Sequence, residues 1–272
     1  ISTLLMVELN NRNSLMRTYS RMVSCSFLVL ITMASLPNPS MKASIVTMCF
    51  IAFTLIIWNC YQDRHAAGWA FYAYFCIGLA SLVFIQVFYY LPILWLCMIF
   101  FSNCFSARTF LASLIGVIAP YWFVSGYFAY TDNPVSYQAL SDHFTAIIDY
   151  QELFDYSQIT LHQLINYGFI VILGLLGTIH FIHSSYADKI RTRMIYDSFI
   201  TLSIVTWVFM ILQPQHENEL CGIMIANTAP LIAHFITFTK GKITNIAFIA
   251  IILITMFITL FNIFVPPVVL LQ

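Results

Sequence analysis

The sequence predicts an all-α protein, a polytopic bundle of transmembrane helices with about nine spans and one amphipathic helix outside the membrane. Two properties of the composition support this fold class. Of the 272 residues, 61% are apolar and 8% are charged, whereas soluble domains have about 45–50% and about 25%. Mean hydropathy is +0.86, and apolar runs recur along most of the chain. The bilayer is therefore expected to be the main solvent of these side chains.

Charge and cysteine content exclude several classes of protein. Eleven Lys and Arg residues balance eleven Asp and Glu residues, so the chain lacks the basic excess that neutralises nucleic-acid phosphates. The seven cysteines lie within or at the ends of apolar segments and form no CxxC pair. They are interpreted as packing residues, not as a disulfide framework or a zinc site. The expected partners are membrane lipids and other membrane-protein subunits, with no nucleic acid.

Each sufficiently long apolar run is interpreted as a helix, because a backbone in hydrocarbon must form its hydrogen bonds within the segment. The predicted spans are residues 22–36, 43–61, 69–85, 88–103, 109–127, 164–184, 199–212, 221–239 and 245–264, in a single membrane domain over 1–272. Spans 22–36 and 199–212 are short for a full crossing. The first is ended by Pro37 and Pro39, and the second span gives way to a polar stretch from Gln62.

The apolar run 69–101 requires a division. It is too long for one untilted span at about 1.5 Å per residue. Tyr89 and Tyr90 are interfacial aromatics, and Pro92 follows them as a helix breaker. A tight turn is therefore predicted between residues 86 and 90.

Basic residues test this partition, because Lys and Arg accumulate in short cytoplasmic loops. Ten of the eleven fall on one side of the predicted membrane: Arg12, Arg17, Arg21, Arg64, Arg108, Lys189, Arg191, Arg193, Lys240 and Lys242. The other side carries Lys42 and the acidic residues Asp132, Asp142, Asp149, Glu152, Asp155, Glu217 and Glu219. The Arg12 end is therefore predicted to be cytoplasmic and the Gln272 end to lie outside.

The outer segment 131–162 contains an amphipathic pattern. Its apolar residues recur at helical spacing, at Tyr137, Leu140, Phe144, Ile147 and Ile148. Polar residues occupy the opposite face, and Pro134 is a suitable start. This pattern predicts a short helix on the outer surface of the membrane.

Three histidines are candidates for chemistry inside the membrane. His180 and His183 are three residues apart, on one helical face, and His234 is expected at similar depth. Neutral imidazoles on two helices can bind a metal or haem iron, or carry a proton. The alternative is hydrogen bonding between helices. It is favoured because no carboxylate or cysteine has ligand spacing nearby, so no metal and no cofactor are predicted.

An acidic group in the outer segment is a second candidate. Asp142, Asp149 and Glu152 can provide a general base or a metal-binding carboxylate, as in membrane glycosyltransferases that use lipid-linked sugars. Such an enzyme must also bind a diphosphate, and Lys42 is the only basic residue on this side. The favoured interpretation is that these charges solvate the outer face.

A polar notch is the third candidate. Asn227 and Thr228 precede Pro230, which leaves a backbone carbonyl one turn earlier without its helical partner. Together with His234 they are candidates for binding a substrate or an ion. The alternative is that they hold helices together, as Gly174 and Gly177 are expected to do by close packing.

Three stretches resemble a group of uncharacterised polytopic inner-membrane proteins of Bacteroidota: residues 17–27 (RTYSRMVSCSF), 213–216 (QPQH) and 227–235 (NTAPLIAHF). The resemblance implies a bacterial inner membrane, with a periplasmic C-terminal end. It also implies an N-terminal part ahead of Ile1. It implies no activity for any residue.

Three functions from different classes remain open at this stage. A membrane subunit or assembly partner of a cell-envelope complex fits the lack of a recognisable catalytic grouping. A transporter or lipid-handling protein would use Asn227, Thr228 and His234. A membrane transferase would use the outer acidic residues. The first is favoured, and enzymatic activity is not expected.

Overall fold

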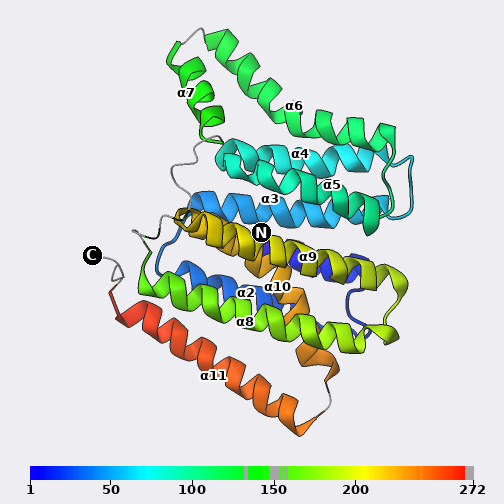
Figure 1. The fold of residues 1–272 in the computed structure, drawn as a ribbon, viewed down its shortest axis with the longest axis vertical. Coiled ribbons are helices and arrows are strands. Elements are labelled where there is room, and N and C mark those ends of the chain that lie inside the picture. The colour runs from blue at the N-terminus through cyan, green and yellow to red at the C-terminus, as the bar shows by residue number, and fades with distance from the viewer. Residues whose placement is uncertain (132–133, 148–153, 155, 157–158, 240, 267–272) are drawn as a thin grey trace. The chain divides into compact units, whose positions relative to one another are not determined.

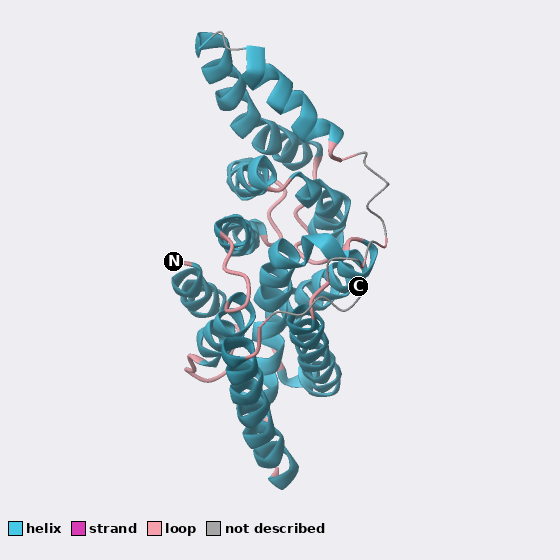
Figure 2. Ribbon diagram, turned by 90° about the vertical axis from the view of Figure 1, so that its left-hand side faces the viewer, coloured by secondary structure: helices cyan, strands magenta, loops and turns pink. Residues whose placement is uncertain are grey.

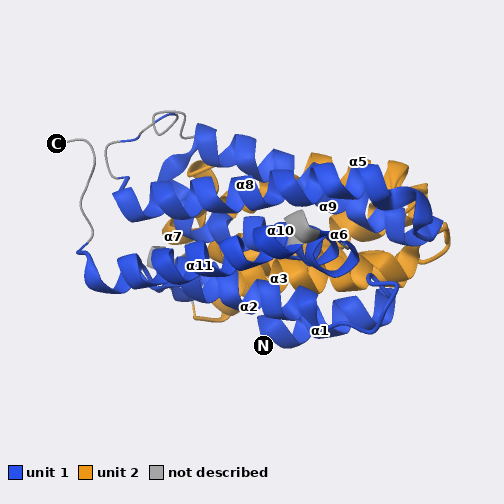
Figure 3. Cartoon of the chain, turned by 90° about the horizontal axis from the view of Figure 1, so that it is seen from below, with its two compact units in different colours: residues 1–44, 153–272 blue, residues 45–152 orange. Residues whose placement is uncertain are grey.

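A computed structural model describes residues 1–131, 134–147, 154, 156, 159–239 and 241–266. All the regular elements of this described part are helices, which confirms the all-α prediction (Figures 1 and 2). The chain forms two compact units (Figure 3). Unit 1 comprises Ile1–Ser44 and Leu153–Gln272, and unit 2 comprises Ile45–Glu152.

Unit 1 is built around one helix, α10. Its helices are α1 (Ser2–Asn13), α2 (Met22–Ser35), α8 (Leu161–Ser184), α9 (Ile190–Leu212), α10 (Glu217–Phe238) and α11 (Lys242–Phe264). Helices α2, α8 and α9 pack against α10, whereas α11 packs at the edge, against α2 and α8 (Figure 1). The buried side chains of unit 1 therefore converge on α10, with Phe199, Tyr196 and Phe181 among the largest.

Unit 2 packs around an aromatic core. Its helices are α3 (Met41–Ile57, whose first residues belong to unit 1), α4 (Ala67–Val83), the 3-10 helix η2 (Ile85–Tyr90), α5 (Leu91–Phe100), α6 (Ala107–Thr131) and α7 (Pro134–Thr145). The ring of Phe53 meets that of Tyr74 edge-on, with centroids 5.4 Å apart. Phe50 and Tyr90 form a second edge-on pair at 6.0 Å. Such offset geometries are the favourable ones for aromatic rings.

Two glycines allow α4 and α6 to approach closely. A Cβ added to Gly78 would lie 2.6 Å from the carbonyl oxygen of Val117, and one added to Gly116 would lie 2.6 Å from that of Phe71. Small residues serve this purpose in membranes, where helices associate through close packing and not through a hydrophobic driving force. This helix pair therefore depends on the absence of side chains at both positions.

Among the described residues, six helical segments are long and apolar enough to cross a membrane: Met41–Cys60, Ala107–Thr131, Leu161–Ala187, Ile190–Leu212, Pro214–Phe238 and Asn245–Phe264. Three shorter apolar segments, Met22–Ser35, Ala67–Val83 and Ile85–Phe100, complete the set. The chain is thus a multi-span integral membrane protein by its helix composition. The nine segments overlap the nine predicted spans, and the prediction that all of them cross the membrane stays a prediction.

One predicted boundary is confirmed by the structure, and two features of the helices differ from the prediction. The division near residues 86–90 is confirmed, where the chain forms the 3-10 helix η2. Helix α9 begins at Ile190 instead of 199, because its first turns carry charged residues that apolarity alone excludes. Helix α1 was not predicted; it has little hydrophobic character of its own and packs against α2.

Candidate functional site

Helix α10 is the most enclosed helix of unit 1 and carries polar groups at three depths. All residues from Leu220 to His234 are buried. Glu217 lies at its first turn, Asn227 and Thr228 near its middle, and His234 one turn before its end. We call these four residues the polar track. At about 1.5 Å per residue, the track extends roughly 25 Å along the helix axis, close to the thickness of a hydrocarbon core.

The His234 end of the track is a charged cluster around Asp188, which lies in the turn between α8 and α9. Its Oδ1 accepts a hydrogen bond from Nε of Arg17 at 2.6 Å, and its Oδ2 accepts one from Nε2 of His234 at 3.2 Å. The Asp188 side chain is 1% exposed and that of Arg17 is 35% exposed. A buried carboxylate therefore joins the segment before α2 to the end of α10.

Arg17 has further partners at this end. Its guanidinium donates to the carbonyl of Ser184 at 3.1 Å and lies 4.8 Å from the ring centroid of Phe238, a cation–π distance. Burial on its own would raise the pKa of Asp188, but the hydrogen bonds from His234 and Arg17 outweigh it and lower that pKa to about 2. Asp188 is therefore ionised at neutral pH and acts only as an acceptor.

His180 and His234 form a pair whose hydrogen bonds define their tautomers. Their ring centroids are 5.4 Å apart. Thr239 donates its hydroxyl proton to the carbonyl of Phe235 at 2.7 Å, so Nε2 of His180, 2.8 Å from Thr239 Oγ1, must be the donor in that contact. His234 likewise donates from Nε2 to ionised Asp188. In both rings Nδ1 is buried and has no hydrogen-bond partner within the described part of the chain.

The structure does not bring the third histidine into this pair. His183 is exposed, although it shares α8 with His180. The described residues contain no group of three His, Cys, Asp or Glu side chains placed to hold a metal ion. His180 and His234 each contact another segment through a hydrogen bond, with Thr239 and Asp188 as their partners.

The middle of the track is an unsatisfied polar site. Both amide atoms of Asn227 and the hydroxyl of Thr228 are buried without hydrogen-bond partners among the described residues, as is Nε1 of Trp207. A Cβ added to Gly174 would lie 2.6 Å from the Trp207 ring and 3.4 Å from Thr228 Oγ1, which places the Trp207 ring and the Thr228 hydroxyl together. Each unsatisfied group costs about 1–3 kcal/mol. Such a cluster requires a water molecule or a polar ligand.

Proline removes one backbone hydrogen bond within α10. Pro230 lies inside α10 and has no N–H to donate, so the carbonyl of Ala226 loses its helical partner. A Cβ added to Gly177 of α8 would lie 2.8 Å from the backbone of Leu231 in α10. The close packing predicted for Gly174 and Gly177 is therefore confirmed.

The Glu217 end of the track lies beside a cavity. Glu217 is 7% exposed and lines a cavity of about 330 Å³ together with Gln163, Tyr167 and Pro214. The Tyr167 hydroxyl donates to the carbonyl of Trp207 at 3.3 Å. Tyr167 thus connects the wall of this cavity to Trp207, the residue beside Thr228.

The predicted outer acidic candidates are placed differently. Asp142 is exposed on α7 in unit 2, and Asp149 and Glu152 lie outside the described residues. Near Asp142 on the same helix, His143 Nε2 lies 2.9 Å from the carbonyl oxygen of Ser81, and the Phe144 ring is 5.1 Å from that of Tyr121. These contacts hold α7 to α4 and α6.

Three members of the site were not predicted from the sequence: Asp188, Arg17 and Trp207. One signal was available: Asp188 is the acidic residue next to the basic group Lys189, Arg191 and Arg193, on the side where carboxylates are scarce. The contact of Trp207 with Gly174 had no signal, since it depends on the packing of α8 against α9. No family model, curated protein or solved structure matches the chain.

Proposed function

We propose that unit 1 transfers protons across a membrane along α10. The observation that carries the proposal is the polar track itself: the one helix enclosed by α2, α8 and α9 has titratable groups at both ends and unsatisfied hydrogen-bonding groups between them. Ionisable residues inside the membrane are costly, and chains of Asp, Glu and His are typical of proton relays. The proposal places the protein in a bacterial inner membrane, with the Arg12 end cytoplasmic.

Each station has a role that its chemistry supports. The cavity beside Glu217, about 330 Å³, is large enough for several water molecules, each of which occupies about 30 Å³ in the liquid. Glu217 exchanges protons with this water. Asn227, Thr228 and the Ala226 carbonyl hold water between the two ends. These groups can donate and accept, as proton transfer along water requires.

His234 is the proton-binding group at the inner end. Its Nε2 is engaged with Asp188, so an incoming proton binds Nδ1, which has no partner among the described residues. The imidazolium that results is stabilised by the Asp188 carboxylate. His180, with its ring centroid 5.4 Å from that of His234, is placed to take the proton onward. Asp188 is in this scheme a positioning residue, not a carrier.

Proton flux into vesicles tests the proposal. The purified protein is reconstituted in vesicles that contain a pH-sensitive dye, and a potassium gradient with valinomycin sets the voltage. We expect voltage-driven flux that is reduced to the level of empty vesicles in His234→Ala and in Asn227→Leu. The matched control is Asp142→Asn, an exposed acidic residue on α7, which should conduct like the wild type. Flux indistinguishable from empty vesicles at both polarities would overturn the proposal.

The other two functions stay predictions from the sequence. A membrane subunit of an envelope complex is compatible with proton transfer, because such a unit can drive a partner. A transferase that uses Asp142, Asp149 or Glu152 is distinguished by the same assay, because it predicts no proton flux from the wild-type protein.

A further inference from the structure

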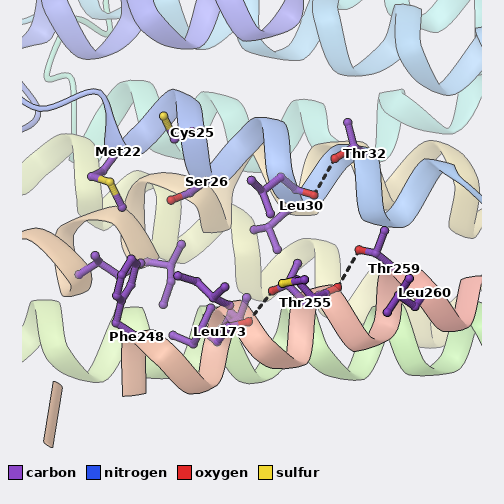
Figure 4. A pocket seen from close by; sticks show the side chains of 16 residues that line it. Met22, Cys25, Ser26, Leu30, Thr32, Leu173, Phe248, Thr255, Thr259 and Leu260 are labelled. Carbon is purple, nitrogen blue, oxygen red and sulfur yellow. Dashed lines mark hydrogen bonds between the residues drawn. The ribbon is translucent and has the colours of Figure 1, made fainter. Parts of the chain in front are cut away.

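A second cavity in unit 1 opens between α2 and α11 and is separate from the polar track (Figure 4). Its volume is about 500 Å³, within the range of ligand sites. Leu173 of α8 and Ile232 and Ile236 of α10 line it together with one face each of α2 and α11. Helix α11 has the least buried membrane window of the six long spans, so this edge of the bundle is loosely closed.

Three of the four hydroxyl groups that line this cavity, those of Thr32, Thr255 and Thr259, already donate a hydrogen bond. Thr255 donates to the carbonyl of Ile251 at 2.6 Å, and Thr259 to that of Thr255 at 2.7 Å. Thr32 donates to the carbonyl of Leu28 and to that of Val29 (Figure 4). These threonines therefore offer no free hydroxyl proton to an occupant. The cavity suits a hydrocarbon chain and not a polar solute.

The dimensions of the cavity match one leaflet. Its lining residues extend from Met22 to Thr32 on α2 and from Phe248 to Leu260 on α11. At about 1.5 Å per residue these stretches are roughly 15–18 Å long, and half of a hydrocarbon core is about 15 Å. An extended acyl chain inserted from one face of the membrane fits this length.

A positive charge lies at one end of the cavity. Arg21 is exposed and directly precedes Met22, the first lining residue on α2. Arg21 is also the N-cap residue of α2, so its guanidinium is near the depth at which a headgroup would lie. We propose that the cavity between α2 and α11 binds one acyl chain of an anionic phospholipid whose phosphate contacts Arg21.

A photoactivatable lipid tests this site on the full chain. The protein is reconstituted in vesicles of equal parts phosphatidylcholine and phosphatidylglycerol, doped with phosphatidylglycerol that carries a diazirine on its acyl chain. After illumination, digestion and mass spectrometry locate the labelled residues. We expect labels to concentrate within Met22–Thr32 and Phe248–Leu260, several-fold above the lipid-facing side of α9.

Two tryptophan variants provide a matched comparison. Val29 lines the cavity and is 49% exposed, whereas Val208 on α9 is outside it and is 50% exposed. Val29→Trp should reduce labelling of α11 several-fold, and Val208→Trp should leave it unchanged. Because both positions are half exposed, neither substitution overpacks a closed core.

The headgroup is tested separately with Arg21→Gln. We expect this substitution to lower the preference for the phosphatidylglycerol probe about fivefold, relative to a phosphatidylcholine probe with the same diazirine chain. A loss of this size corresponds to the contribution of one neighbouring cation to the binding of an anionic lipid. Uniform labelling of all lipid-facing helices, or labelling that Val29→Trp leaves unchanged, would overturn the proposal. Cross-links between two copies of the chain through α11 would also overturn it, because the occupant would then be a protein helix. None of these outcomes depends on proton flux.

Discussion

Asp188 receives two hydrogen bonds on its two oxygens, from His234 at 3.2 Å and from Arg17 at 2.6 Å. The three residues come from different segments: the turn after α8, the end of α10 and the stretch before α2. A carboxylate with 1% exposure is tolerated there only because both oxygens are paired. The pairing gives Asp188 a structural role as well as its proposed role beside His234.

Replacement of Asp188 by Asn should destabilise unit 1. The substitution removes the charge that Arg17 and His234 face while leaving a side chain of the same size. Since Arg17 is 35% exposed and partly hydrated, we expect a loss of about 2 kcal/mol, less than for a fully buried pair. Thermal unfolding in detergent measures this loss. The control is Asp142→Asn, and equal midpoints for the two variants would contradict the prediction.

The same carboxylate should make stability depend on pH in the acidic range. The pKa of Asp188 falls from an ordinary 3.8 to about 2 on folding, so the unfolded chain binds its proton first as the pH decreases. The stabilisation is complete above about pH 4 and is lost as the pH falls toward 2, by about 2 kcal/mol in total. Unfolding midpoints measured across this range should decrease for the wild type. The unfolding midpoint of Asp188→Asn should decrease less over the same range.

Asn227→Leu should separate stability from function. The wild-type amide has no hydrogen-bond partner among the described residues, so its replacement by an apolar side chain of similar size breaks no hydrogen bond between helices. We expect a midpoint equal to or above that of the wild type, together with loss of proton flux. A clear loss of stability in Asn227→Leu would instead indicate that the amide holds helices together.

Gly116→Ala should destabilise unit 2 through the contact of α4 with α6. The added Cβ would lie 2.6 Å from the carbonyl oxygen of Phe71, which forces the helices apart at a cost of about 1–3 kcal/mol. Gly126, on the same helix, has no atom within 4 Å of an added Cβ. Gly126→Ala should therefore be neutral or stabilising by helix propensity. Equal effects of the two variants would rule out close packing at Gly116.

Reporter fusions should establish the orientation of the chain. The cluster of Asp188, Arg17 and His234 lies beside the basic group of Arg191 and Arg193, which the positive-inside bias predicts to be cytoplasmic. A reporter that is active only in the cytoplasm should work when fused after Arg193 and fail after Glu152. Activity of the reporter fused after Glu152 would contradict the predicted orientation. Glu217 would then lie at the cytoplasmic end of α10 and His234 at the opposite end.

The sequence alone was sufficient for the fold class and for the positions of the apolar helices. In a bilayer each segment must satisfy its own backbone, so a run of apolar residues already implies a helix. Local chemistry also located the division at residues 86–90 and the start of α7 at Pro134. The start of α9 at Ile190 was not predicted. The first turns of this helix carry charged residues, and a search for apolar runs leaves such turns out.

The membership of the candidate site was decided only by tertiary structure. Sequence marked Asn227, Thr228 and His234 because polar residues in apolar helices are conspicuous, and it grouped His180 with His183 because they share a helical face. The packing of α8, α9 and α10 instead placed His180 beside His234 and left His183 exposed. It also brought Arg17 to Asp188 across 171 positions of the chain. Periodicity describes one helix at a time, whereas burial and pairing depend on which helix lies opposite.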